Sequence, residues 1–244
     1  MAIDLYVSTS SPVCAYVLIL AKRLGLELNV HTISIRNKDN LKADFVQMNP
    51  QKTVPLLNDN GVILAESRAI GMYLVNKYAP GSSLYPQDAE KRAIVDRLIF
   101  FEFASVYASG EKMFKAYTKL RYPSKEEKDD ALEGMRTVVE MLRGKRFLAG
   151  DSLTLADLGL CTSLEMFFRQ DISSGFKDLE QLREYYERVN AGMPEIQDIL
   201  SKTMDELCDV ICRCKRIIEI ASSKPEQPQS EVANNDKQRY HNVK

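Results

Sequence analysis

49-NPQKTVPLLNDNGVILAESRAI-70 combines strand, turn and helix signals within 22 residues of this sequence. Two short apolar runs, Val54–Asn58 and Val62–Leu64, flank Asp59-Asn60-Gly61, a turn signal that favours a β-hairpin. The apolar spacing that follows predicts a helix from about Glu66 to Tyr78. The stretch therefore predicts a hairpin that leads directly into a helix.

The residues before this stretch alternate between strand and helix signals. Pro12 opens a long apolar segment, where its missing N–H is tolerated in a first helical turn, and Gly25 ends that segment. The predicted elements are strand Ile3–Val7, helix Pro12–Leu24, strand Leu28–Ile35 and helix Asn40–Met48. With the hairpin and its helix they give the order β-α-β-α-β-β-α, which predicts an α/β unit with a mixed sheet and helices packed on it.

The residues after the stretch lack strand signals and predict an all-α unit. The segment 80-PGSSLYP-86 is a loop signal and the expected domain linker. We expect one domain at 1–80, a helical domain at 88–221, and a polar, aperiodic tail at 222–244 that is disordered. Helical periods cover Ala89–Leu120, Ser124–Leu142, Thr154–Gln170, Leu179–Asn190 and Glu195–Ala221, and the last of these carries an apolar stripe of Leu207, Ile211, Cys214 and Ile218.

The composition is that of an ordinary globular protein. The 244 residues are 45% hydrophobic and 27% charged, with a formal net charge of -1, which gives no field to attract nucleic acid or an anionic membrane. No apolar run approaches the roughly 18 residues that span a bilayer, and the N-terminus has no secretory pattern. An odd number of cysteines, five, argues against a disulfide framework. We therefore expect a cytoplasmic protein with no nucleic-acid or membrane partner.

The Val54-Pro55 pair is the first specific motif. A cis bond entering a strand exposes the backbone N–H and C=O of Val54 at the strand edge, where an extended peptide can pair with them. The alternative is an ordinary trans proline at the start of a strand. Because only about 5–6% of X–Pro bonds are cis, the motif taken alone favours the trans form.

Glu66-Ser67-Arg68 marks the junction between the hairpin and the next helix. A helix N-terminus carries free N–H groups and partial positive charge, which suit a carboxylate ligand. Ser67 can donate its hydroxyl to that carboxylate and Glu66 can accept from an ammonium group, so the pair suits an α-amino acid head. The alternative is a plain helix cap.

The hydroxyl cluster Ser8–Ser11 lies between the first strand and Pro12. A hydroxyl at such a junction can hydrogen-bond a thiolate, which lowers the pKa of the thiol. Serines before a helix are otherwise ordinary caps, and the loop alone favours that reading.

Taken in this order, the three motifs resemble the glutathione transferases. Ser10-Ser11-Pro12 is similar to the opening of the insect delta/epsilon class, in which the active serine lies two residues before a proline. The resemblance covers residues 1 to about 205 and includes Asn49-Pro50-Gln51, Val54-Pro55, Glu66-Ser67-Arg68-Ala69-Ile70 and Leu153-Thr154-Leu155-Ala156-Asp157, where Thr154 and Asp157 stand at capping-box spacing. It implies a thioredoxin-like N-terminal domain, an all-helical C-terminal domain, a homodimer, and glutathione as co-substrate with no metal.

The resemblance also implies roles for individual residues. Ser10 would stabilise the glutathione thiolate, with Ser11 as its nearest rival. The implied glutathione-binding residues are Val54 with Pro55 at the cysteinyl backbone, Glu66, Ser67 and Arg68 at the γ-glutamyl end, and Lys52 at the glycine end.

Two positions depart from the family pattern. Lys52 stands where a histidine is usual; its ammonium is a flexible point charge that can still reach a carboxylate. Cys14 and Ala15 follow the proline where an arginine is often found. Both departures concern affinity and turnover rather than the fold.

The second substrate is expected between the domains. Tyr107, Glu111, Phe114 and Tyr117 recur at helical spacings and share a face that suits an apolar ligand, or else forms bundle core. Glu111 is either a solvated or salt-bridged residue, or accepts a hydrogen bond from a hydroxyl on a ligand such as a sterol.

Cys208, Cys212 and Cys214 lack a further pair to complete a zinc site, so we expect apolar filler on the last helix and no metal. His31 is expected in a strand and His241 in the tail.

The leading hypothesis is a transferase that conjugates glutathione to apolar electrophiles. The alternative is a low-turnover ligand-binding or carrier protein, for example for a sterol-like apolar hydroxylated ligand, that keeps the glutathione site.

Overall fold

The computed structural model describes residues 3–223. Its N-terminal part is built on a four-stranded sheet with the order β2-β1-β3-β4. The strands are β1 (Ile3–Val7), β2 (Leu28–Thr32), β3 (Leu56–Asp59) and β4 (Val62–Leu64). β1 runs parallel to β2 and antiparallel to β3, and β3 and β4 form the predicted hairpin. The sheet is therefore mixed, as the sequence predicts.

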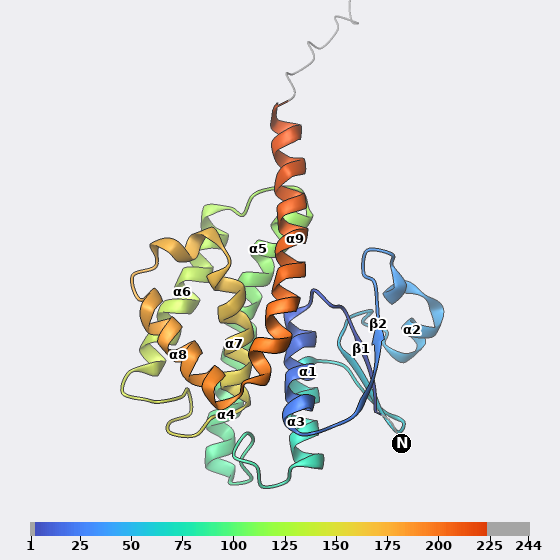
Figure 1. The fold of residues 1–244 in the computed structure, drawn as a ribbon, viewed down its shortest axis with the longest axis vertical. Coiled ribbons are helices and arrows are strands. Elements are labelled where there is room, and N and C mark those ends of the chain that lie inside the picture. The colour runs from blue at the N-terminus through green and yellow to red at the C-terminus, as the bar shows by residue number, and fades with distance from the viewer. Residues whose placement is uncertain (1–2, 224–244) are drawn as a thin grey trace, which may run out of the picture.

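Helices cover both faces of this sheet. α1 (Pro12–Arg23) and α3 (Ser67–Tyr78) lie between the sheet and the helical part of the molecule, and α2 (Ala43–Met48) lies on the other side (Figure 1). Leu5 of β1 alternates with half-buried neighbours and is fully buried on the inner face. On the outer face, Phe45 of α2 meets the ring of Tyr6 at 6.0 Å between centroids. This thioredoxin-like unit presents α1 to the helical domain.

Several predicted boundaries in this unit are wrong by a few residues. β2 ends at Thr32 instead of Ile35, because Ser34 and Asp39 bond each other in a turn: the Ser34 N–H donates to the Asp39 carboxylate at 3.0 Å. The predicted helix from Asn40 begins only at Ala43, after a 3-10 turn at Asp39–Leu41.

The helical domain begins with a long helix that changes its hydrogen bonding midway. The sequence predicts one helix over Ala89–Leu120, whereas the structure has α4 (Ala89–Phe101), a π-helical segment (Glu102–Tyr107) and α5 (Ala108–Thr118). Such π segments often mark functional sites. Further along the chain come α6 (Lys125–Leu142), α7 (Leu155–Phe168) and α8 (Leu179–Gly192).

Local capping fixes where α7 starts. Asp157 accepts hydrogen bonds from both the backbone N–H and the hydroxyl of Thr154, so the predicted capping box is confirmed. The same carboxylate accepts from the Leu148 N–H at 2.8 Å and the Tyr185 hydroxyl at 2.6 Å. Asp157 therefore ties the loop before α7 and helix α8 to one buried point.

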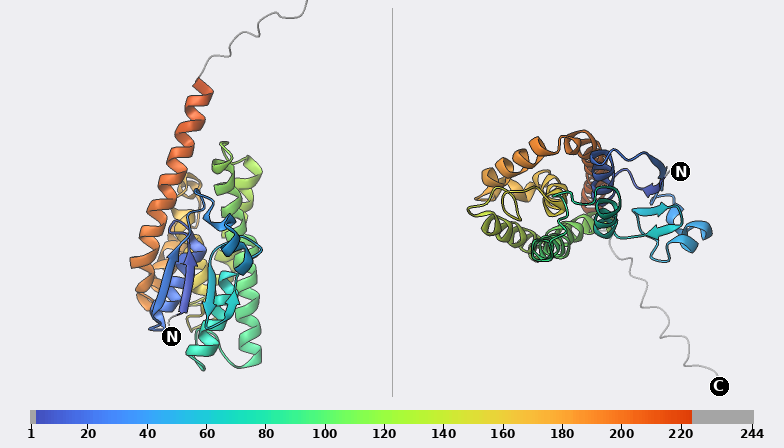
Figure 2. Two further views of the ribbon diagram at one scale, coloured as in Figure 1. Left: turned by 90° about the vertical axis from the view of Figure 1, so that its right-hand side faces the viewer. Right: turned by 90° about the horizontal axis from the view of Figure 1, so that it is seen from below.

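The last helix, α9 (Glu195–Ser223), packs along α1 and then runs past the rest of the molecule (Figures 1 and 2). Its predicted stripe is confirmed, since Leu207 and Ile218 are buried and Ile211 and Cys214 are half-buried. The predicted tail lies almost wholly outside the described residues, as does His241. Within residues 3–223, no helix is both long and apolar enough to cross a bilayer.

Candidate active site

The loop between β1 and α1 places Ser10 at the open end of a helix. The Ser11 N–H donates to the Ser8 carbonyl at 3.1 Å, and the Ser8 N–H donates to Cys14 Sγ at 3.4 Å. Pro12 occupies the first helical turn, and no side chain caps the N-terminus of α1. The positive end of the helix dipole therefore faces the loop, which favours a nearby negative charge.

The two candidate serines differ in what their hydroxyls do. The Ser11 hydroxyl and the Ser8 N–H both bond the sulfur of Cys14, yet burial dominates and raises the pKa of that thiol to about 11. The Ser10 hydroxyl is half-exposed and has no hydrogen-bond partner among residues 3–223. Cys14 is almost fully buried, and its sulfur fixes the Ser11 hydroxyl through their hydrogen bond.

The Val54–Pro55 peptide bond is cis, the rarer of the two alternatives open from the sequence. Asn49, which is buried, holds the loop before it: its side-chain amide donates to the Thr53 carbonyl at 2.8 Å, and its side-chain oxygen accepts from the Gln51 N–H at 3.1 Å. Val54 is half-buried, and its N–H and C=O have no partner in the described part of the chain.

Lys52 lies on the same loop in a left-handed conformation, with a φ of 60°. Its side chain is exposed, and its carbonyl accepts from the side-chain amide of Asn40 at 2.8 Å. The ammonium is therefore free to swing toward an anionic group at the loop.

The start of α3 is a second open helix end. Glu66, at the N-cap position, has a φ of 68°, which is unusual for a residue other than glycine, and provides no side-chain cap. Non-glycine residues in such conformations cluster at functional sites. Glu66 is exposed, whereas Ser67 is buried at the first helical position. The free N–H groups of this helix end can bind a carboxylate.

Arg68 is turned away from this helix end into the contact between the domains. Its Nε and Nη2 donate to one carboxylate oxygen of Glu102 at 3.0 and 2.7 Å. The Ser163 hydroxyl donates to the other oxygen at 2.6 Å. The guanidinium lies 4.3 Å from the ring centroid of Tyr16. A side chain at Gly159 has no room, because an added Cβ would lie 2.8 Å from a Glu102 oxygen.

The sequence reasoning missed Glu102 and Ser163. The available signal was a single carboxylate inside the apolar run 98-LIFFEF-103, since a buried charge needs a partner. Nothing in the local sequence names that partner, because Arg68 and Ser163 are 34 and 61 residues away.

The predicted aromatic face is divided between two neighbourhoods. Tyr107 belongs to the neighbourhood of Arg68 and Cys14. Burial raises the pKa of its hydroxyl, Glu111 and Cys14 raise that pKa further, and the Arg68 charge lowers it. Tyr117 is buried at the other end of α5, against Tyr122 and Lys215 of α9.

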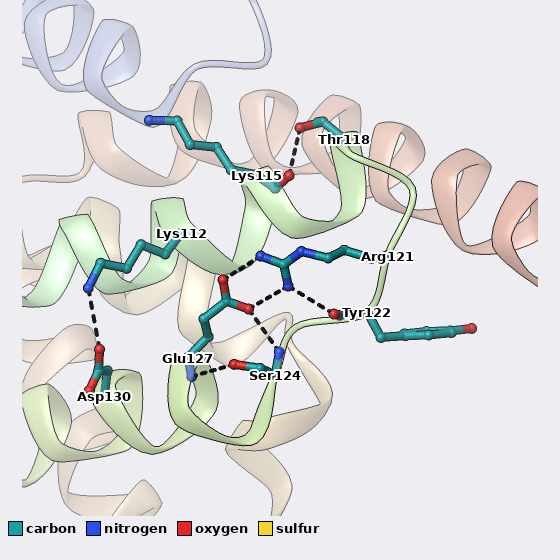
Figure 3. Close-up of polar contacts among 8 residues, drawn as sticks. All are labelled: Lys112, Lys115, Thr118, Arg121, Tyr122, Ser124, Glu127 and Asp130. Atoms are coloured by element: carbon teal, nitrogen blue, oxygen red, sulfur yellow. Dashed lines mark hydrogen bonds and ion pairs between the residues drawn. The ribbon is translucent and has the colours of Figure 1, made fainter.

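Glu111 and Phe114 lie between these two neighbourhoods. Glu111 forms an ion pair with Lys115 at 2.9 Å, which is one of the roles expected for it. Phe114 is half-buried against the core. Figure 3 shows Lys115 pointing away from the contacts that join α5 to α6.

A well-defined cavity of the helical domain does not coincide with these residues. It has a volume of about 490 Å³ and lies among α7, α8 and α9, lined by Glu165, Phe168, Arg169, Arg183, Tyr186, Glu187, Asn190 and Gln197. None of the candidate site residues lines it, so we do not place the electrophile there.

No group of three or more possible metal-ligating side chains occurs among residues 3–223. The expectation that the α9 cysteines fill apolar space is wrong for Cys212, which is exposed because it lies outside the buried stripe. His31 is in β2, as predicted, and stacks on Tyr6.

The structure thus joins a thioredoxin-like domain, in which no side chain caps the start of α1 or α3, to an all-helical domain. The chain belongs to the glutathione transferase family, in its insect delta/epsilon class. The model of the "Glutathione S-transferase, N-terminal domain" matches residues 5–82, and that of the "Glutathione S-transferase, C-terminal domain" matches residues 101–192.

Relatives of both classes match most of the chain. Glutathione S-transferase D7 of Drosophila melanogaster is 34% identical over 212 residues, which are 85% of this chain and 94% of that protein. A delta-class glutathione transferase from Nilaparvata lugens has a TM-score of 0.79 at 30% identity, covering 87% of this chain and 99% of the other. An epsilon-class enzyme from the housefly, Musca domestica, has a TM-score of 0.78 at 27% identity, covering 87% and 98%.

Proposed function

We propose that this glutathione transferase conjugates glutathione to apolar electrophiles and that the Ser10 hydroxyl stabilises the glutathione thiolate. One observation carries the choice of serine: the Ser11 hydroxyl is engaged by Cys14, whereas the Ser10 hydroxyl is unpartnered beside the open end of α1. A hydroxyl and a helix N-terminus both favour a thiolate over a thiol. Ser10 does not attack; it lowers the pKa of the thiol that glutathione brings.

The rest of the tripeptide is proposed to lie along the two open backbone sites. The unpaired N–H and C=O of Val54, before Pro55, pair with the cysteinyl residue as an added strand does. Ser67 and the first N–H groups of α3 bind the γ-glutamyl carboxylate, and Glu66 accepts from its ammonium. Lys52 reaches the glycine carboxylate. Arg68 supports Ser67 from behind, with a guanidinium nitrogen 3.4 Å from the Ser67 hydroxyl.

The electrophile is proposed to lie between the serine loop and the start of α5. Arg68 and Cys14 both influence the pKa of the Tyr107 hydroxyl, and the Phe103 ring stacks on Tyr107 at 5.3 Å. Glu111 and Phe114 extend this wall. Tyr117 faces α9 and shapes the far end.

We also propose a cytoplasmic homodimer. The proposed contact lies on α4 and β4, where large apolar side chains are exposed: Phe100 is 67% exposed, and Ile94, Val62 and Ile63 are each more than 40% exposed. Covering such side chains with a second copy removes apolar surface from water. All five cysteines are free thiols, which supports a reducing compartment such as the cytoplasm.

The test compares Ser10→Ala with the matched variant Ser11→Ala. A hydrogen bond to a charged group is worth about 1.5–3 kcal/mol, so Ser10→Ala should lower kcat/KM for an aryl halide roughly 10–100-fold. The pKa of bound glutathione, read from thiolate absorbance, should rise by about 1–2. Ser11→Ala should change both far less. Equal losses in the two variants would contradict the assignment. A wild-type protein that binds immobilised glutathione without any rate above solution would instead favour the carrier alternative.

A further inference from the structure

Helix α9 is joined to α1 and to the serine loop by three polar contacts. Arg23 at the end of α1 lies 3.6 Å from Glu195, and Lys22 lies 2.8 Å from Asp198. At the other end of α1, the Thr9 hydroxyl donates to the Glu206 carboxylate. Residues 195 and 206 are eleven apart, about three helical turns, so they share one face of α9. That face lies along α1 (Figures 1 and 2).

The serine loop has few other restraints at its tip. Its backbone hydrogen bonds run from Ser8 and Ser11 to one another and to α1. Thr9 and Ser10 take no part in them. Among the described residues, the bond between Thr9 and Glu206 is therefore the hydrogen bond that ties the tip to the helical domain, across 197 residues of sequence. A carboxylate acceptor makes this bond stronger than one between neutral groups.

We propose that Glu206 is a positioning residue for the serine loop: by accepting from Thr9, it holds the neighbouring Ser10 hydroxyl where the glutathione sulfur lies. This inference rests on the proposed role of Ser10. Glu206 itself does not touch the reacting atoms in this scheme. The last helix thereby takes part in activating the thiol, although it belongs to the domain that binds the second substrate.

The roles of the bond and of the charge can be separated. Thr9→Val keeps the shape and the Glu206 charge but removes the donor. Glu206→Gln keeps an acceptor for Thr9 but removes the negative charge, which by itself opposes a nearby thiolate. If the bond is what matters, Thr9→Val and Glu206→Ala are impaired, whereas Thr9→Ser and Glu206→Gln remain close to wild type.

The experiment measures kcat, KM for glutathione and the thiol pKa of bound glutathione in these variants. Thr9→Val and Glu206→Ala should each lower kcat about three- to tenfold, since one hydrogen bond is worth on the order of 1 kcal/mol, with little change in KM. Both should raise the thiol pKa. The double variant should be no worse than either single variant, because both remove the same bond.

Asp198→Ala is the matched control for Glu206→Ala, because it removes the neighbouring Lys22 contact between α1 and α9 without touching the loop. It should leave kcat and the thiol pKa unchanged. The inference is overturned if Asp198→Ala impairs kcat as much as Glu206→Ala does, if the effects of the two single variants add, or if Thr9→Val leaves the thiol pKa unchanged.

The Ser10→Ala variant separates this inference from the function on which it rests. If Ser10→Ala has no effect on the thiol pKa, the proposed function fails. If Ser10→Ala raises it but Thr9→Val does not, only the positioning role fails. In the Ser10→Ala background, Thr9→Val should cause no further rise, and a further rise of similar size would contradict the mechanism.

Discussion

Two arginine–glutamate pairs in this molecule have the same number of guanidinium hydrogen bonds and different surroundings. In the Arg68–Glu102 pair, two guanidinium N–H groups donate to the carboxylate and a serine, Ser163, donates as well. In the Arg121–Glu127 pair, two guanidinium nitrogens donate at 2.7 and 2.6 Å, and the Ser124 N–H donates to the same carboxylate (Figure 3).

Burial and sequence separation distinguish the two pairs. The side chains of Arg68 and Glu102 are 7% and 1% exposed, and they join α3 to the helical domain across 34 residues. Those of Arg121 and Glu127 are 48% and 19% exposed and only six residues apart. Water competes for an exposed pair, whereas a buried group that loses its partner has no replacement. Similar hydrogen bonds therefore carry different energetic weight.

The buried pair also lies beside the proposed glutathione site, because Arg68 follows Ser67 directly. It connects the open end of α3 to the π-helical segment and to α7. The exposed pair lies where α5 turns into α6 and fixes a helix start. One pair thus orients two domains, and the other orders a corner.

The largest expected effect is that of Glu102→Gln. The substitution keeps the shape but leaves the buried Arg68 guanidinium without a counter-charge, which typically costs about 3–5 kcal/mol. Urea unfolding should give a free energy of unfolding that is lower by that amount. The double variant Arg68→Met with Glu102→Met should lose less than the single one, since apolar side chains need no partner. A loss below about 1 kcal/mol for Glu102→Gln would remove the distinction between the two pairs.

Ser163→Ala tests the same network through its neutral member and should have an intermediate effect. It removes a buried donor to a charged acceptor, a bond worth about 1.5–3 kcal/mol. Ser109→Ala is the matched control, because the Ser109 hydroxyl is also buried but donates to the neutral Val106 carbonyl at 2.9 Å. The control should cost about 0.5–1.5 kcal/mol in the same unfolding measurement. If Ser109→Ala costs as much as Ser163→Ala, the charge of Glu102 is not what gives Ser163 its weight.

The two pairs also differ in how far apart their residues lie in the sequence, and that distance decides which features the sequence predicts. The hairpin, the helix that follows it and the capping box of Thr154 and Asp157 depend on residues within a few positions of one another, so the pattern predicts them. The family resemblance supplies Ser10, Val54 and Ser67 as candidates because their motifs are local too.

The contacts that the sequence reasoning missed join distant segments. Arg68 meets Glu102, and Thr9 meets Glu206, only because the helices pack as they do. The π-helical segment is missed for a related reason: apolar periodicity marks a buried face but does not report one extra residue in a turn. The proposed choice of Ser10 over Ser11 depends on the contact between the Ser11 hydroxyl and Cys14, which the sequence does not reveal.

The smallest expected effect is that of Glu127→Gln, which isolates the charge of the exposed pair. Glutamine can still accept from the Ser124 N–H, so the capping box survives. The Arg121 guanidinium lowers the pKa of Glu127 to about 2, from a usual value of 4.5. Because the pKa is lowered in the folded state, the pair stabilises the protein above about pH 4.5, and that contribution is lost as the pH falls toward 2.

The unfolding midpoints of wild type and Glu127→Gln should therefore differ slightly at neutral pH and low salt, and converge in acid or at high salt. A shift as large as that of Glu102→Gln, or one that persists in acid, would mean that the corner is protected from water and that burial does not separate the two pairs.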